Sequence, residues 1–218
     1  MATSPTEVRR ILQVVRDDAG EDLSRLARSV PRSDVRGLLV ELTPALLSAY
    51  TDGSSALAVE WYSEIREESR ARAAYAPAPV VDLDRERIRR SVLWATESDL
   101  DIDAVLARLT PRAEEEIARG FWDTIEQNAT RDPEAAGWRR VARFNACPFC
   151  RMLADRGAIY RESTARFAAH RNCHCIAEPV FKGGETGPTA SVEQYRASTR
   201  RRTDADRAAL RKYLRENY

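Results

Sequence analysis

The sequence has few of the features that mark membrane, secreted or disulfide-linked proteins. Among 218 residues there are two lysines, two histidines and four cysteines. No run of about 18 apolar residues occurs, so we expect no membrane-spanning helix. The N-terminal residues lack the basic and then apolar pattern of a secretory signal, so we expect a protein made and kept in the cytosol. In that compartment, cysteines serve as metal ligands more often than as disulfides.

Motifs of the common enzyme classes are also missing from the sequence. It contains no G-x-S-x-G nucleophile motif, no phosphate-binding G-x-x-x-x-G-K-[ST] and no dinucleotide-binding G-x-G-x-x-G. Neither the H-E-x-x-H of zinc peptidases nor the H-x-E with P-C-x-x-C of zinc deaminases occurs. We therefore expect a protein that is not an enzyme.

Charge is unevenly distributed along the chain. Residues 1–136 contain 18 Arg and 26 Asp or Glu, whereas residues 137–218 contain 17 Arg or Lys and 8 Asp or Glu. A GC-rich genome would explain the preference for arginine over lysine but not this asymmetry. The acidic first part and the basic second part suggest different partners. The basic tail suggests contact with nucleic-acid phosphates, and a solvated terminus is the simpler alternative.

Apolar residues recur at helical spacing through the first 128 residues. Ser4-Pro5-Thr6-Glu7 is a capping box that predicts the start of the first helix, and Gly20 predicts its end. Pro44 predicts a bend or restart, and new helices are expected near residue 52 and at Thr110-Pro111. The chain is therefore expected to be mainly α.

The pattern changes after this helical part, where turns and short apolar pieces follow a loop expected over residues 132–137. Residues 176–181 are the best strand candidate, and residues 203–206 predict the cap of a short basic helix ending at Leu214. A helical N-terminal part followed by a small α+β zinc-binding module and a basic C-terminal tail is the predicted fold. The expected parts are an N-terminal helical region (1–76), an extended Pro-containing connector (77–83), a second helical region (84–136), the zinc-binding module (137–182), and a hinge with the basic tail (183–218).

Every cysteine and both histidines lie between residues 147 and 175, a segment that we call the cysteine window. It begins with Cys147-Pro148-Phe149-Cys150 and ends with His170-Arg171-Asn172-Cys173-His174-Cys175. A C-x-x-C motif places two thiolates on one side of a tight turn, and the two cysteines of an extended C-x-C face the same way. The candidate ligands of a structural Zn²⁺ are Cys147, Cys150, His170, Cys173 and Cys175. Spacing alone does not decide which four of them bind.

Other roles for the cysteine window are a redox-active dithiol, disulfides or a catalytic zinc ion. Cys-Pro-aromatic-Cys occurs in glutaredoxin-like sites, but there the motif follows an early strand, and here it follows a long helical region. A catalytic zinc ion needs an open position and a general base beside it. The pattern offers no clear base, which favours a structural ion that supports a small module.

Several segments, taken together, point to a known family. They are residues 58–66, Cys147 to Tyr160, His170 to Cys175 and residues 178–181. This set resembles the Mu F-like minor capsid (head morphogenesis) proteins of tailed bacteriophages, especially those that infect actinobacteria. The similarity runs from about residue 33 to 182 and is most specific over 138–181. The usual H-P-x-C-R-C of the family is altered here by Arg171 and His174, which leaves His174 as an additional possible ligand.

The resemblance implies a low-copy structural protein inside the phage head, made in the host cytoplasm. Its implied partners are the portal protein and/or the major capsid protein, with possible contact to packaged DNA through the basic tail and none to a membrane. A zinc-dependent nucleic-acid-binding protein or nuclease is the alternative from another class. In that alternative, His170 or His174 would act chemically.

Overall fold

The computed structural model describes residues 1–80, 82–97, 101–155, 160, 167, 174–183 and 203–217. These residues form six helices and one two-stranded sheet, so the prediction of a mainly helical protein is confirmed. The helices are α1 (Pro5–Arg28), α2 (Arg32–Glu68), α3 (Arg85–Ala95), α4 (Ile102–Arg131), α5 (Pro148–Asp155) and α6 (Asp204–Asn217). The strands are β1 (Ala135–Val141) and β2 (Ile176–Phe181). None of the helices within these ranges is long and apolar enough to cross a membrane.

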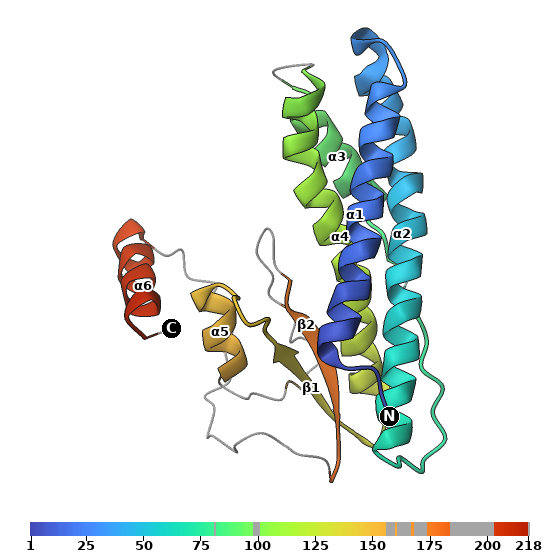
Figure 1. Ribbon diagram of the computed structural model, residues 1–218, viewed down its shortest axis with the longest axis vertical. Coiled ribbons are helices and arrows are strands. Elements are labelled where there is room, and N and C mark those ends of the chain that lie inside the picture. Colours follow the sequence, from blue (N-terminus) through green and yellow to red (C-terminus); the bar gives the residue numbers. More distant parts are fainter. Residues whose placement is uncertain are drawn as a thin grey trace.

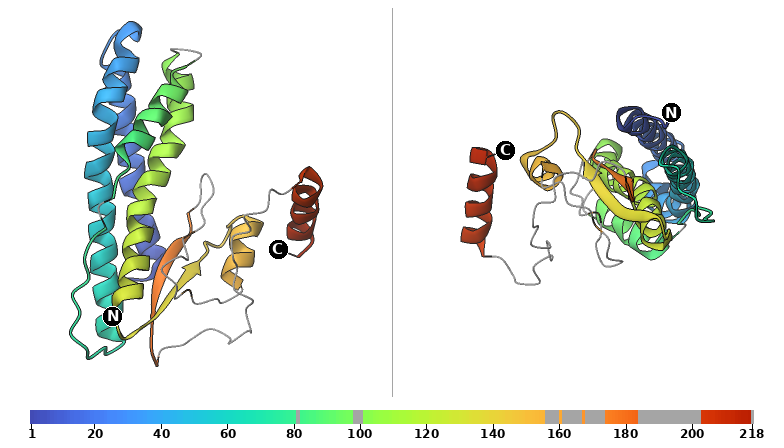
Figure 2. Two further views of the ribbon diagram at one scale, coloured as in Figure 1. Left: turned by 180° about the vertical axis from the view of Figure 1, so that it is seen from behind. Right: turned by 90° about the horizontal axis from the view of Figure 1, so that it is seen from below.

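Three long helices, α1, α2 and α4, form an elongated bundle, with α3 packed near one end (Figure 1). The sheet lies against the opposite end of α4, and α5 lies between the sheet and α6 (Figure 2). The helical bundle and the C-terminal elements therefore form two visibly different regions.

The helices of the bundle are longer than the sequence predicts. α1 continues through Gly20, α2 contains Pro44 and continues past residue 52, and α4 contains Pro111. The predicted helix end at Gly20 and the predicted restarts near residue 52 and at Thr110-Pro111 are therefore wrong. A proline removes one helical hydrogen bond, but burial of apolar side chains along the whole length of each helix outweighs such a local loss.

Local capping signals, in contrast, are confirmed at both ends of the chain. The Ser4 side chain accepts a hydrogen bond from the Glu7 amide at 3.2 Å, and Pro5 is the first residue of α1. Thr203 caps α6, because its hydroxyl accepts from the Asp206 amide at 3.2 Å and its own amide donates to the Asp206 carboxylate at 2.9 Å. The helix continues three residues beyond the predicted end at Leu214.

Helices α2 and α4 approach each other closely at Gly120. A β-carbon at this position would lie 2.6 Å from the Thr51 methyl group and 2.9 Å from the hydroxyls of Ser54 and Ser55. The Ser54 hydroxyl also donates to the Ile117 carbonyl of α4 at 2.6 Å. Small side chains on α2 and a glycine on α4 therefore allow the two backbones to touch.

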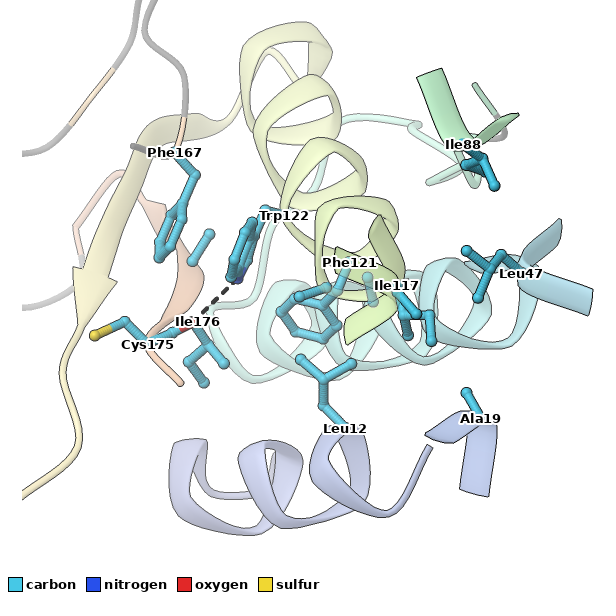
Figure 3. Packing of buried hydrophobic residues seen from close by; sticks show 14 of the residues in the cluster. Leu12, Ala19, Leu47, Ile88, Ile117, Phe121, Trp122, Phe167, Cys175 and Ile176 are labelled. Atoms are coloured by element: carbon cyan, nitrogen blue, oxygen red, sulfur yellow. Dashed lines mark hydrogen bonds between the residues drawn. The ribbon is translucent and has the colours of Figure 1, made fainter. Parts of the chain in front are cut away.

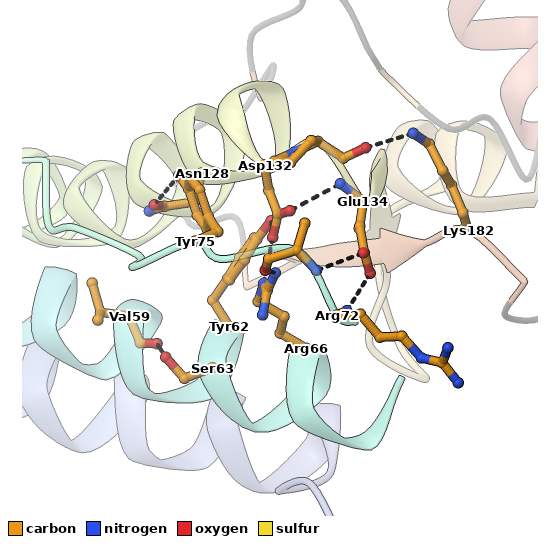
Figure 4. Close-up of polar contacts among 12 residues, drawn as sticks. Val59, Tyr62, Ser63, Arg66, Arg72, Tyr75, Asn128, Asp132, Glu134 and Lys182 are labelled. Carbon is orange, nitrogen blue, oxygen red and sulfur yellow. Dashed lines mark hydrogen bonds and ion pairs between the residues drawn. The ribbon is translucent and has the colours of Figure 1, made fainter. Parts of the chain in front are cut away.

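A buried polar network closes the end of the bundle that adjoins the sheet (Figure 4). The Asp132 carboxylate, which is fully buried, accepts hydrogen bonds from Arg66 at 2.8 Å and from the Tyr62 hydroxyl at 3.3 Å. Its second oxygen accepts from the Glu134 amide at 3.0 Å. Burial, with the nearby Asp132 charge, raises the pKa of Tyr62. The network joins the ends of α2 and α4 to the start of β1.

The connector between α2 and α3 runs along α4 without forming a helix or a strand over its described residues, 71–80 and 82–84. The Asn128 side chain accepts from the Ala78 amide at 3.0 Å and donates to the Ala78 carbonyl at 2.8 Å. The Thr124 hydroxyl accepts from the Val80 amide at 3.0 Å. Side chains of α4 thus bind the backbone of Ala78 and Val80. The connector's two prolines exclude it from a helix.

Strands β1 and β2 form an antiparallel ribbon that we call the β-ribbon. The predicted strand over residues 176–181 is confirmed, whereas the loop expected over residues 132–137 is wrong because β1 begins at Ala135. A bulge lies between Ala135 and Gly137, and Gly137 has a φ of 137°, a conformation that suits glycine. These irregularities explain why the start of the strand looks like a loop in the sequence.

Candidate metal centre in the cysteine window

The β-ribbon connects the chain on either side of the cysteine window. Val141, the last residue of β1, pairs with Ile176, the first residue of β2. Cys147 follows Val141 by six positions in the sequence, and Cys175 immediately precedes Ile176. Cys175 and the chain that leads to Cys147 therefore adjoin the same end of the ribbon.

The first half of the window forms the start of α5. The Cys147 carbonyl accepts a hydrogen bond from the Arg151 amide at 3.0 Å. The Cys147 sulfur accepts a second one from the Cys150 amide at 3.4 Å. Cys147 is thus the N-cap of a helix whose first residue is Pro148. The tight turn expected for C-x-x-C is the first turn of this helix, which holds both thiols. Cys147 is half-buried and Cys150 is buried.

Cys150 lies beside a buried arginine of the β-ribbon. The Arg140 guanidinium is 3.9 Å from the Cys150 sulfur and 3.7 Å from the centre of the Phe167 ring. A guanidinium at this position complements the negative charge of a thiolate ligand. Arg140 pairs across the ribbon with Ala177, and side chains two residues apart on a strand face the same way. This alternation places Cys175 on the face of the ribbon that carries Arg140.

His174 and Cys175, the described residues of the second half of the window, are bonded to the helical bundle, and Figure 3 shows the contact between Trp122 and Cys175. Arg9 of α1 donates to the His174 carbonyl at 3.0 Å, and Trp122 of α4 donates to the Cys175 carbonyl at 3.1 Å. The guanidinium of Arg16 lies 3.3 Å from Nδ1 of His174. Because a guanidinium only donates, Nδ1 accepts in this contact when the imidazole carries its proton on Nε2.

Phe167 joins the window to the bundle through aromatic stacking. Its ring stacks on Trp122 with a centroid distance of 4.5 Å and lies 5.8 Å from the ring of Trp138. Its amide donates to the buried carboxylate of Glu126 at 2.5 Å. Tyr160 stacks on the other tryptophan, Trp138, at 4.5 Å. The module therefore completes its core with side chains of α4.

Three of the five predicted ligands, Cys147, Cys150 and Cys175, are described, and they occur at the same end of the β-ribbon. His170 and Cys173 lie outside the described residues. Among the side chains that the structure describes, no group of three or more Cys, His, Asp or Glu is arranged to hold a metal ion. The donor chemistry of thiols beside a guanidinium fits Zn²⁺, and the ligand set stays a prediction.

Sequence reasoning missed the residues that position the window, namely Arg9, Arg16, Arg140 and Glu126. Arginine is so frequent in this chain that no single one stands out. The separation between Arg16 and His174 is 158 residues, and no local pattern connects them. The one available signal was the spacing of Trp122 and Glu126, which places both on the same face of α4.

Comparison with known proteins identifies a family but no individual relative. Neither the curated proteins nor the solved structures contain a match to this chain. A family model described as VG15 protein matches residues 2–201, which include the helical bundle, the β-ribbon and the cysteine window. The match ends before α6 begins. The chain therefore belongs to the VG15 protein family, a bacteriophage-related family.

Proposed function

We propose that this protein is a minor capsid protein that acts in head morphogenesis, inside the phage head and bound to the portal protein and/or the major capsid protein. A family match over nearly the whole chain supports a phage role. The resemblance of residues 138–181 to Mu F-like proteins supports the narrower assignment. In this proposal the acidic helical bundle docks on the capsid or portal, and the cysteine window is a structural element.

The proposal rests on the hydrogen bonds that connect the cysteine window to the helical bundle. Arg9, Arg16 and Trp122 of the long helices bind residues 174 and 175 through two carbonyls and one ring nitrogen. These contacts use the polar groups of the window to fix the module against the helices. A rigid brace of this kind suits a protein that maintains a shape between larger partners.

We further propose that the window holds a structural Zn²⁺. Cys147 and Cys150 would bind it from the first turn of α5, Cys175 from the β-ribbon, and His170 or Cys173 would complete the set. The ion would supply a cross-link between α5 and β2, which otherwise contain few residues with which to build a core of their own. Arg140 would balance the charge of the thiolates.

Metal stoichiometry of the purified full chain tests the zinc site. We expect about one zinc ion per chain, loss of the ion in Cys147→Ser and in Cys150→Ser, and retention in the control His174→Ala. Wild-type protein without zinc, or cysteine variants that keep it, would contradict the site. Metal-dependent DNA cleavage that His174→Ala abolishes would instead favour a nuclease.

Purified virions test the capsid role. We expect the chain to be present at low copy and to form cross-links with the portal or major capsid protein when virions are treated with a short cross-linker. The extended bundle should supply the cross-linked acidic side chains. Absence of the chain from virions whose heads are complete would overturn the proposal.

A further inference from the structure

Helix α6 is docked on the module as a separate element. Leu214 of α6 is buried and, with Leu210, packs against Met152, Leu153 and Phe149 of α5 in a small apolar cluster. This cluster is distinct from the main core, in which Cys150 takes part. Since the family match ends at residue 201, membership of the family implies nothing about α6.

The arginines of α6 form a stripe along its exposed surface. Arg207, Arg211 and Arg215 occur at intervals of four residues and are all exposed. This spacing places successive guanidinium groups about 6 Å apart along the helix axis.

Lys212 adds a fourth exposed cation, and its contact with Glu216 is long, at 3.9 Å. Arg207 has a carboxylate partner, Asp204, at 3.2 Å, and both side chains are well exposed. Exposed pairs of this kind exchange readily for another anion.

We propose that α6 binds the phosphate backbone of nucleic acid without reading its sequence. Duplex DNA presents closely spaced phosphates, and arginine binds them through paired N–H donors. The sequence immediately before α6 extends the positive charge, with Arg200, Arg201 and Arg202 preceding the cap residue Thr203. The attachment to α5 would connect such a contact to the cysteine window.

Nucleic acid fits this surface better than a membrane or an acidic protein does. An amphipathic helix that lies on a membrane inserts an apolar face, but the leucines of α6 are already packed against α5. A protein partner would be expected to meet apolar anchors within a charged rim, whereas the stripe is formed by cations. The inference does not depend on the proposed capsid role, because it concerns purified protein in solution.

The experiment measures binding of the full chain to a fluorescent duplex of about 30 base pairs at about 50 and 200 mM salt. Arg207→Gln, Arg211→Gln and Arg215→Gln are combined in one variant. We expect this variant to bind about tenfold or more weakly at the lower salt concentration, because three phosphate contacts are lost. The slope of log affinity against log salt should fall by about three. Glutamine keeps helix propensity, and circular dichroism verifies that the variant folds.

The control combines Arg36→Gln, Arg89→Gln and Arg90→Gln, three exposed positions on the bundle helices with the same total change in charge. It should bind DNA as the wild type does, within about twofold. Equal loss in both variants, or no loss in the α6 variant, would overturn the inference. So would a result in which the α6 variant loses binding to anionic vesicles of phosphatidylserine and phosphatidylcholine while its DNA binding is unchanged. Virion incorporation is not part of this measurement, so failure here is distinct from failure of the capsid proposal.

Discussion

The helical bundle and the module that follows it are stabilised in different ways. The bundle buries side chains along three long helices, among them Trp61 and Phe121, whose rings stack at 5.9 Å. The described part of the module contains a two-stranded ribbon and the short helix α5. Buried residues of the ribbon, among them Trp138 and Ile176, belong to the same cluster as those of the bundle, whereas Met152 and Leu153 of α5 pack with α6. A two-stranded ribbon alone is marginally stable in water. The module therefore depends on α4, and in our proposal on a metal ion, whereas the bundle has a core of its own.

Removal of the proposed ion should give the largest difference between the two regions. With a strong zinc chelator, we expect the amides of α5 to exchange hydrogen as rapidly as in an unfolded chain, because the cross-link to β2 is lost. Amides in the middle of α2 and α4 should remain protected. Hydrogen exchange with mass spectrometry measures both, and restoration by added zinc is the control. Simultaneous loss of protection in both regions would show that they unfold as one unit.

Asp132→Ala should destabilise the bundle strongly. The substitution leaves Arg66, whose side chain is 14% exposed, without its buried partner. We expect the free energy of unfolding to fall by about 3–5 kcal/mol. Urea denaturation followed by circular dichroism measures this change. Asp52→Ala, at an exposed position of α2, should change it by less than about 0.5 kcal/mol. Similar small effects in both variants would mean that the network contributes little.

Gly120→Ala should have an intermediate effect on the bundle. The new methyl group would lie within 2.6 Å of Thr51, so α2 and α4 must separate, at a cost of about 1–3 kcal/mol. The gain in helix propensity, about 1 kcal/mol, offsets part of this cost.

Gly37→Ala is the matched control, because a β-carbon there meets no atom within 4 Å. It should raise the free energy of unfolding by about 0.5–1 kcal/mol. Thermal denaturation of the two variants compares them directly. A stabilising Gly120→Ala would contradict the close helix contact.

The smallest expected effect is a dependence of bundle stability on alkaline pH. Burial raises the pKa of Tyr62 above its ordinary value near 10, and a hydrogen bond to Asp22 raises the pKa of Tyr50 to about 12. The unfolded chain therefore releases these protons at lower pH than the folded chain does. The contribution of these two tyrosines to the free energy of unfolding is complete below about pH 10 and is lost as the pH rises above that value.

Urea midpoints between pH 8 and 11 should fall less steeply in Tyr62→Phe than in wild type. Tyr213→Phe, at an exposed position of α6, should keep the wild-type slope.

Sequence reasoning succeeded where the structure is decided by neighbouring residues. The caps at Ser4 and Thr203 each depend on a residue three positions away. The strand over residues 176–181 is short, and both of its ends carry large apolar residues. The cysteine window was located because its residues are rare in this chain.

Sequence reasoning failed where distant segments decide the structure. Helix α1 passes through Gly20 because it packs along its whole length, and a β-carbon at this position would lie 3.4 Å from the methyl group of Thr110 on α4. Strand β1 could not be found alone because its partner is about 40 residues further along the chain. The contact of Arg16 with His174 likewise requires the folded arrangement.

The pairing of Val141 with Ile176 fixes both ends of the intervening chain at neighbouring positions. The entropy of closing such a loop grows only slowly with its length. Added residues between α5 and β2 should therefore cost little folding free energy, provided that the ribbon keeps its register and Phe167 keeps its contacts with Trp122 and Glu126. An insertion that meets both conditions, whether acquired during evolution or added as a tag, should leave the bundle undisturbed.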